Sequence, residues 1–369
     1  MKSKTKTIFK TLALLASIAC LALSSDSAMK AAREAATTCF TILLPSLFPF
    51  FVLSRMLVAS GGAGILGHWL HWLMRPLFRI NGNGAAAFLL GIISGYPVGA
   101  KTVTELYRSR SLTKAEAENL LCFSNNSGPL FILGAVGVGM FSSRSIGLLL
   151  YAVHVLSAIT VGVLLRFTIP APSIRTAAAQ TAADCNAFTT SVEDSVSTLL
   201  HVFGYVIFFA VIMQLLQDFQ ITLLLTRFLS FVNLPGSVIN AVFCGVLELT
   251  CGIKKLSEAI APLSVQLIFT SAVLGWAGLS VHFQVKGILS GSGLSFGKYL
   301  FGKGLQAIVA AVYASAALVV VPLHTPTFIQ RMLPQPSAAP APLLPALLSC
   351  VLLSAYAIRV IRSARQSTH

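Results

Sequence analysis

Residues 85–106 read AAAFLLGIISGYPVGAKTVTEL, and residues 120–141 read LLCFSNNSGPLFILGAVGVGMF. Both segments begin apolar, break at glycine, proline or amide residues, and then resume as apolar sequence. Backbone groups that are freed by such a break are tolerated at membrane depth only where protein or a water-filled cavity satisfies them. We therefore expect both breaks to lie inside a bilayer and to help form a solute site.

The composition of the chain indicates that lipid, and not water, surrounds most of it. Of 369 residues, 56% are hydrophobic and 10% are charged, and the mean hydropathy is +0.83. Soluble domains carry about 25% charged residues. The 11 acidic residues are too few to cover a soluble protein of 39.1 kDa. The predicted fold class is an all-α polytopic membrane protein, with the lipid bilayer as its main partner.

The net charge is +15, and basic residues lie at both ends of the apolar sequence. Lysines precede the first apolar run, and Arg359, Arg362 and Arg365 follow the last one. Basic residues that flank apolar spans set orientation in a membrane, so we expect cytosolic tails and no nucleic-acid partner. The first run also resembles a signal peptide, but an uncleaved helix is the preferred interpretation in a chain that is apolar throughout.

Six segments are apolar enough to be predicted as spanning helices of about 20 residues. They are residues 8–24, 40–60, 146–167, 196–216, 300–321 and 343–360. Residues 63–80 carry tryptophans and arginines within an apolar stripe, which is typical of a helix lying in the membrane interface.

A short internal similarity divides the chain into two halves. Residues 245–259, GVLELTCGIKKLSEA, match residues 91–106 with one gap. Paired interrupted segments at corresponding positions are a pointer to a transporter binding site. We expect two repeated halves, inverted if each crosses the membrane an odd number of times. The predicted divisions are an N-terminal membrane helix with an amphipathic segment (1–39), the first repeat (40–169), a polar linker (170–195), the second repeat (196–322) and a proline-rich link with a C-terminal membrane helix and basic tail (323–369).

The first broken segment has the features of an anion site. Gly95 and Gly99 permit unusual backbone angles, and Pro97 removes a backbone donor. The helix that resumes after Pro97 would point unpaired N–H groups and a positive dipole end at an anion. Lys101 lies one turn in, spaced to pair with Glu105. The alternative is that these two charges mark a helix emerging into water.

The second broken segment places Asn125, Asn126 and Ser127 next to Gly128. Amides offer donors and acceptors, so they can orient a solute without a buried charge. The alternative is that they hold helices together. In the second half, Glu248 is an ionisable candidate that could carry a proton, coordinate Na⁺ or pair with Lys254 or its neighbour. We expect the pairing.

The sequence offers little to support catalysis or a bound cofactor. The seven cysteines are scattered without a CxxC pair, and no phosphate-binding GxxxxGK[ST] loop occurs. No Ser/His/Asp or Cys/His arrangement stands out. We therefore expect no enzyme, no cofactor and no metal site.

The strings GIISGYPVGAKTVTEL and FSNNSGPLFILGAVGVGMF resemble the YlbJ family of sporulation integral membrane proteins. That family is grouped with the nucleoside-recognition, or Gate, membrane domains, which are similar to halves of concentrative nucleoside transporters. The likeness extends from about residue 40 to residue 321. It implies an endospore-forming bacterium, the mother-cell membrane around the forespore, and the movement of dipicolinic acid during cortex formation.

Together these features favour a secondary transporter of a small organic anion, with dipicolinate as the implied cargo. Ser94, Tyr96 and Gly99 would shape the site, and Lys101 would neutralise the substrate. A nucleoside-type carrier and a non-transporting scaffold for sporulation proteins are the alternatives. The sequence leaves open whether H⁺ or Na⁺ is the coupling ion and whether the chain forms a homo-oligomer.

Overall fold

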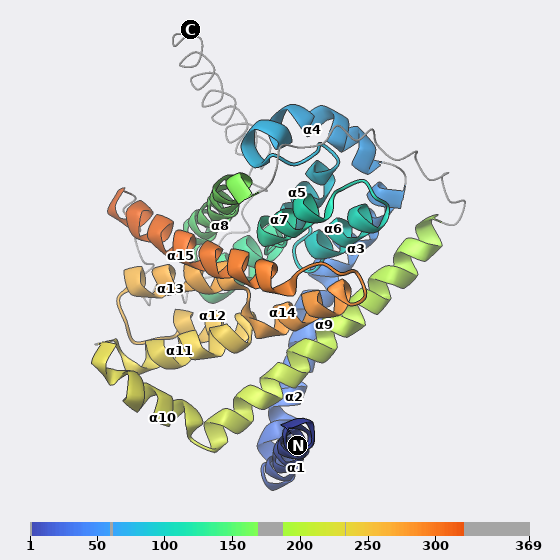
Figure 1. Cartoon of the computed structure of the whole chain (residues 1–369). Helices are drawn as coiled ribbons and strands as arrows, with labels where there is room; N and C mark the ends of the chain where they lie inside the picture. Colours follow the sequence, from blue (N-terminus) through green and yellow to red (C-terminus); the bar gives the residue numbers. More distant parts are fainter. Residues whose placement is uncertain (1, 60–61, 169–186, 233, 321–369) are drawn as a thin grey trace. The chain divides into compact units, whose positions relative to one another are not determined.

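The computed structural model describes residues 2–59, 62–168, 187–232 and 234–320, and these residues form helices with no strand among them (Figure 1). The elements before residue 169 are α1 (Lys2–Leu23), α2 (Ser25–Thr38), η1 (Cys39–Leu43), α3 (Leu44–Ala59), α4 (Gly62–Phe78), α5 (Gly84–Ile93), α6 (Val98–Arg108), α7 (Lys114–Ser124), η2 (Leu130–Met140), α8 (Arg144–Leu165) and η3 (Arg166–Thr168). Those after residue 186 are α9 (Ala187–Asp218), α10 (Ile221–Phe228), η4 (Leu229–Val232), α11 (Gly236–Leu247), α12 (Leu249–Ser257), α13 (Leu263–Trp276), α14 (Gly278–Leu289) and α15 (Phe296–Val320). The predicted all-α fold is confirmed.

Four segments of the described chain are long and apolar enough to cross a membrane. They are Arg144–Thr168, Phe188–Asp218, Leu263–Leu289 and Phe296–Val320. The shortest have 25 residues, which is about 37 Å of helix and exceeds a hydrocarbon core of about 30 Å. A fifth span results if α1 and α2, which meet at a 90° bend, count as one. The chain is a multi-pass membrane protein.

Three predicted spans match these segments, two do not, and one lies outside the described residues. Residues 146–167, 196–216 and the described part of 300–321 fall within spanning helices, whereas residues 8–24 belong to the bent pair. The predicted span at 40–60 is wrong: η1 is a π-helix, α3 contains Pro49, and the apolar helix Leu47–Met56 is short. The spanning segment Leu263–Leu289 was not predicted as one. Residues 343–360 lie outside the described residues.

The linker predicted at 170–195 is shorter than expected. Helix α9 begins at Ala187, so its first turns occupy the end of that range, while residues 170–186 lie outside the described residues. The polar side chain of Asp194 in these turns pairs with Arg55 of α3. This acidic residue of the predicted linker therefore takes part in a tertiary ion pair.

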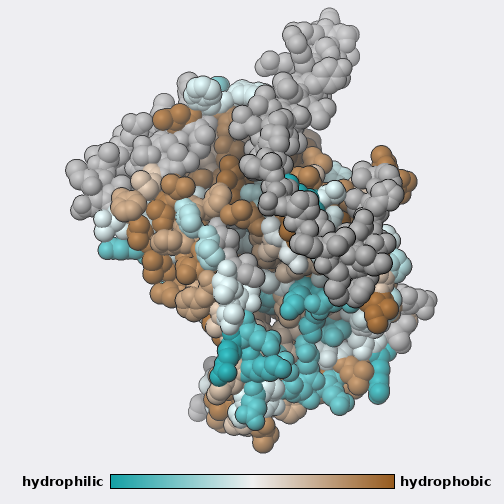
Figure 2. Space-filling view, turned by 180° about the vertical axis from the view of Figure 1, so that it is seen from behind, coloured by the Kyte–Doolittle hydropathy of each residue, from teal (hydrophilic) through white to brown (hydrophobic). Residues whose placement is uncertain are grey.

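The surface of the spanning helices is largely apolar, as lipid contact requires. Leu200 and Phe208 of α9 and Ile308 of α15 each expose more than half of their side-chain area. Figure 2 shows brown, apolar residues over much of the coloured surface on one side of the molecule, with hydrophilic residues gathered at the lower end of the view. Because exposed apolar patches of this extent are unusual in soluble monomers, this surface fits contact with lipid.

The first broken segment is a hairpin of two short helices. Helices α5 and α6 pack against each other, and the chain reverses at residues 94–97, where Gly95 has φ +85°. A Cβ on Gly91 would lie 3.3 Å from the Cα of Gly99, so the two helices cross backbone to backbone. A Cβ on either glycine would also collide with the carbonyl oxygen of Ser124. The hairpin therefore packs tightly against the end of α7.

The second half contains a similar hairpin of two short helices. Helices α11 and α12 form a close pair that breaks at Glu248, and a Cβ on Gly252 would collide with the Cα of Gly245. These two glycines are the ones that the sequence match aligned with Gly99 and Gly91. The crossing of two helices at an equivalent glycine pair supports the internal repeat, whereas its inverted orientation remains a prediction.

Each hairpin also packs against a second break. In the first half, Gly95 lies against Gly128, between α7 and η2. In the second half, Gly278 is the first residue of α14 and has φ +83°. A Cβ on Gly278 would lie 3.4 Å from the Cα of Glu248. Both halves thus bring two interrupted segments into contact at their breaks.

Helix α15 joins the two halves through close packing. It contacts α13, α7 and α8 (Figure 1). A Cβ on Gly275 would lie 2.7 Å from the Cα of Ala307, and one on Gly302 would collide with Cys122. Small residues allow such close helix contacts in membranes. As a result, the inward-facing side chains of α15 reach the break that follows α7.

Candidate functional site

A small cavity lies where the breaks of the two halves meet. Its volume is about 70 Å³, and it is lined by Gly95 and Tyr96 of the first break, Ser127 and Gly128 of the second, and Glu248 of the second half, among others. Sequence motifs as far apart as residues 95 and 248 are therefore brought together. We call this space the deep cavity. This volume is far below the roughly 300–1,000 Å³ of small-molecule sites, so the deep cavity is too small for a drug-sized solute in this conformation.

A larger cavity lies beside the deep cavity, between α6, α9 and α14. Its volume is about 380 Å³, which is within the range of small-molecule sites. Val202 and Gln284 line both cavities, so the two adjoin. We call this space the outer cavity. The other residues that line it are Pro97, Lys101, Thr104, Glu105, Arg108, Ser197, Thr198, His201, Tyr205, Gly287 and Ile288.

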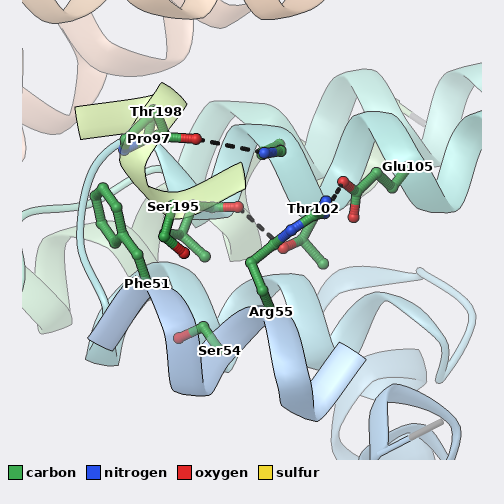
Figure 3. A pocket seen from close by; sticks show the side chains of 10 residues that line it. Phe51, Ser54, Arg55, Pro97, Thr102, Glu105, Ser195 and Thr198 are labelled. Carbon is green, nitrogen blue, oxygen red and sulfur yellow. Dashed lines mark hydrogen bonds and ion pairs between the residues drawn. The ribbon is translucent and has the colours of Figure 1, made fainter. Parts of the chain in front are cut away.

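The charges around Lys101 differ from those that the spacing predicted. Glu105 pairs with Arg55 (Figure 3). Arg55 also pairs with Asp194, so the predicted Lys101–Glu105 pair is wrong. The guanidinium of Arg55 can serve two carboxylates at once, and it comes from a helix that local spacing cannot reveal. The Nζ of Lys101 instead donates to Thr198 Oγ1 at 3.4 Å.

The outer cavity consequently presents positive charge. Among the described residues, no carboxylate lies within ion-pair distance of Lys101, and Arg108 adds a second cation to the lining. The one carboxylate in the lining, Glu105, is already paired with Arg55. Lys101 is only partly buried. Its ammonium is therefore placed to bind an anion that enters this cavity.

The N-terminus of α6 is less open to an anion than predicted. The amide of Val98 donates to Gly95 O at 3.1 Å, and that of Ala100 donates to Asn125 Oδ1 at 3.4 Å. The side chain of Asn125 thus takes one of the donors that the sequence had assigned to a solute. The buried Ser94 bonds Ser54 of α3, and Gly99 contacts Ser124, so both shape the hairpin from outside the cavities.

The two asparagine amides face protein groups in this conformation. The Nδ2 of Asn125 donates to Tyr299 OH at 3.3 Å. The Nδ2 of Asn126 donates to Phe123 O at 2.7 Å, and its Oδ1 accepts from Gln306 Nε2 at 3.0 Å. Neither asparagine lines the two cavities. The alternative role, holding helices together, describes both amides here, while Ser127 and Gly128 face the deep cavity.

Glu248 has a different partner from the one expected. Its carboxylate accepts from the backbone amides of Thr250 at 3.0 Å and Cys251 at 2.7 Å, so it caps the N-terminus of α12. The predicted pairing with Lys254 or its neighbour is wrong, since no such ion pair occurs among the described residues. Lys254 is exposed on α12 and lines neither cavity. A carboxylate at a helix N-terminus is favoured by the helix dipole.

The sequence reasoning missed a buried polar cluster on α8, α14 and α15. Lys303 and Gln306 lie on one face of α15, and His154 of α8 accepts from the amide of Ser127 at 3.1 Å. His282 Nδ1 lies 3.1 Å from Tyr299 OH. The signal was available, because an ionisable residue within an apolar span marks a functional candidate. Lys303 was overlooked because its flanking glycines indicated close packing.

Two comparisons with known proteins found similarity to this chain. The family described as Nucleoside recognition (Gate) matches residues 40–170 of this chain. The chain is 35% identical over 325 residues to the sporulation integral membrane protein YlbJ of Bacillus subtilis (strain 168), covering 81% of this chain and 79% of that protein. No solved structure matches. With this extent of identity over most of both chains, the protein belongs to the YlbJ family of integral membrane proteins, and its first half is similar to a nucleoside-recognition Gate domain.

Proposed function

We propose that this protein carries a small organic anion across the membrane, and that its cargo is dipicolinate during endospore formation. The observation that carries the proposal is the outer cavity: it holds Lys101 without a carboxylate partner and adjoins a cavity formed at helix breaks of both halves. The relative's name supports a role in sporulation. We place the protein in the mother-cell membrane around the forespore.

The chemistry of the outer cavity suits an aromatic dicarboxylate. Lys101 and Arg108 supply two positive charges, and Tyr205 and Pro97 supply flat apolar surface for a ring. Hydroxyls of Ser197 and Thr198 and the amide of Gln284 offer neutral hydrogen bonds. The solute is thus held by both charge and shape. Passage onward requires the deep cavity to widen, so alternation would involve separation of the breaks around Gly95, Gly128 and Glu248.

A nucleoside-type carrier is the second candidate. It is favoured by the family description of residues 40–170 and by Gln284, whose amide lines both cavities and could bind a neutral base. The two candidates differ in their need for charge. Dipicolinate binding should depend on Lys101, whereas nucleoside binding should not.

The test is uptake of labelled dipicolinate into vesicles that contain the purified full-length protein, with a nucleoside competitor in a parallel series. We expect saturable uptake that nucleosides do not inhibit. Lys101→Ala should raise KM about tenfold, the equivalent of one charge-assisted contact. Lys254→Ala, which removes an exposed lysine outside both cavities, is the matched control and should behave as wild type.

The outcomes separate the function classes. If nucleosides inhibit uptake and Lys101→Ala leaves the KM unchanged, the anion-carrier proposal is contradicted and the nucleoside carrier is favoured. Uptake no greater than in empty vesicles, at normal incorporation of the protein, would contradict transport and favour a scaffold for sporulation proteins.

A further inference from the structure

Lys303 is a buried lysine that has no acidic partner among the residues that the structure describes. It lies within the spanning helix α15, seven residues after Phe296, and its side chain is 0% exposed. The ion pairs found among the described residues involve Arg55, Lys114 and Lys298, and none involves Lys303. A charged group that is removed from water costs several kcal/mol unless its surroundings replace the lost hydration. The surroundings of Lys303 therefore need an explanation.

Oxygen atoms and an aromatic face surround the ammonium. Its Nζ donates to the backbone carbonyl of Asn125 at 3.1 Å and to Gln306 Oε1 at 2.6 Å. It also lies 5.5 Å from the centre of the Tyr96 ring. Asn125 directly follows the last residue of α7, where the helix dipole is negative. Neutral oxygens, a helix C-terminus and a π face are groups that attract a cation without neutralising it.

These groups are oriented by other residues and not by Lys303 alone. Gln306 Nε2 donates to Asn126 Oδ1 at 3.0 Å, which turns Gln306 Oε1 toward the ammonium. The side chain of Asn125 is held between Ala100 N and Tyr299 OH. A cage whose oxygens are fixed by second contacts should keep its shape when the ammonium is removed. Such a cage is a binding site in its own right.

We propose that the Asn125 carbonyl, the Gln306 amide oxygen and the Tyr96 ring form a monovalent-cation site, and that Lys303 fills it as a cation built into the chain. The site connects α15 to both breaks of the first half, through Tyr96 of one and Asn125 of the other. A tethered ammonium does at this place what a bound Na⁺ would do, so the protein does not need free Na⁺ here. The site is independent of the transport proposal, because binding and thermal stability test it.

The first experiment replaces the tethered cation with a free one. Lys303→Ala removes three methylenes and the ammonium, and n-propylammonium has the same atoms. In detergent-purified protein we expect Lys303→Ala to melt roughly 5 °C or more below wild type. Addition of n-propylammonium chloride should restore at least half of that loss with a saturable dependence. Choline chloride at equal ionic strength should not, because the quaternary head has no N–H to donate.

Two further variants keep the test decisive if Lys303→Ala does not fold. Lys303→Met has similar length without charge and should melt below wild type, whereas Lys303→Arg should melt closer to wild type. The matched control is Lys286→Ala, which removes an exposed lysine of α14 and should show no specific response to n-propylammonium. Wild-type melting in Lys303→Met, or a folded Lys303→Ala variant that does not respond to n-propylammonium, would overturn the proposal.

A second readout concerns the coupling ion. In vesicles, we expect replacement of Na⁺ by K⁺ to leave wild-type dipicolinate uptake unchanged within twofold. A strict Na⁺ requirement in wild type would overturn the statement that Lys303 takes the place of free Na⁺. Absence of uptake in every buffer would instead contradict the transport proposal, and the melting data would still decide whether the cation site exists.

Discussion

Gly95 and Gly128 lie backbone against backbone, so that a Cβ on Gly95 would be 2.8 Å from the amide nitrogen of Gly128. These residues belong to the two breaks, 33 positions apart in the sequence, that the motifs SGYP and SNNSGP mark. Because the contact is between main chains, neither partner can move aside as a side chain could. The lining of the deep cavity depends on this contact, since both glycines line it.

Gly95→Ala is expected to disturb the hairpin of α5 and α6 more than an ordinary glycine substitution does. The residue has φ +85°, which alanine adopts at a cost of about 1–2 kcal/mol, and the added methyl collides with the Gly128 backbone. Thermal melting of the purified protein should show a clear loss. Gly134→Ala is the control, since nothing lies within 4 Å of where its Cβ would be. Equal melting of the two variants would contradict the close contact.

The internal repeat predicts matching effects at the two glycine crossings. Gly99→Ala and Gly252→Ala both place a methyl against backbone, that of Ser124 in the first case and Gly245 in the second. Each should destabilise the protein by about 2 kcal/mol or more, since overpacking against backbone is not relieved by rotamer changes. Gly304→Ala, on α15 with open space around it, serves as control. Folded protein with wild-type melting in either variant would mean that the crossing is not tight.

Arg55 is expected to keep Lys101 available by holding Glu105. In Arg55→Ala, Glu105 loses its partner and can pair with Lys101, one turn away on α6. Dipicolinate uptake at low substrate should then fall about tenfold. The double variant Arg55→Ala/Glu105→Gln removes the competing carboxylate and should recover most of the uptake. A double variant as poor as the single one would show that Arg55 acts through another contact, such as the one with Asp194.

Glu248 is expected to stabilise the fold by capping the N-terminus of α12. Glu248→Ala leaves the amides of Thr250 and Cys251 without their acceptor and should cost about 1–2 kcal/mol. Glu248→Gln retains an acceptor oxygen and should lose less. Melting curves of the two variants check the order. Lys254→Ala should be neutral, because Lys254 does not pair with Glu248 in the structure. If Lys254→Ala destabilised the protein as much as Glu248→Ala, the result would indicate that Lys254 and Glu248 form an ion pair.

The sequence alone determined the membrane class, three of the spanning helices and the position of both breaks in the first half. These features depend on local properties: hydropathy over about 20 residues, and glycine or proline within an apolar run. The glycine match between residues 91–106 and 245–259 also located the two broken segments that the structure folds as hairpins. Local pattern was insufficient at 40–60, where Pro49 and the π-helix η1 interrupt an apolar stretch.

Only the tertiary structure decided the partners of the polar groups. Glu105 pairs with Arg55, 50 residues away, although Lys101 is one turn away. The carbonyl of Asn125 accepts from Lys303, 178 residues further along the chain. Spacing along a helix shows which side chains can meet on that helix, but not which helix will pack against it. A buried charge takes the partner that best replaces its lost hydration, and that partner exists only once the distant helices have packed.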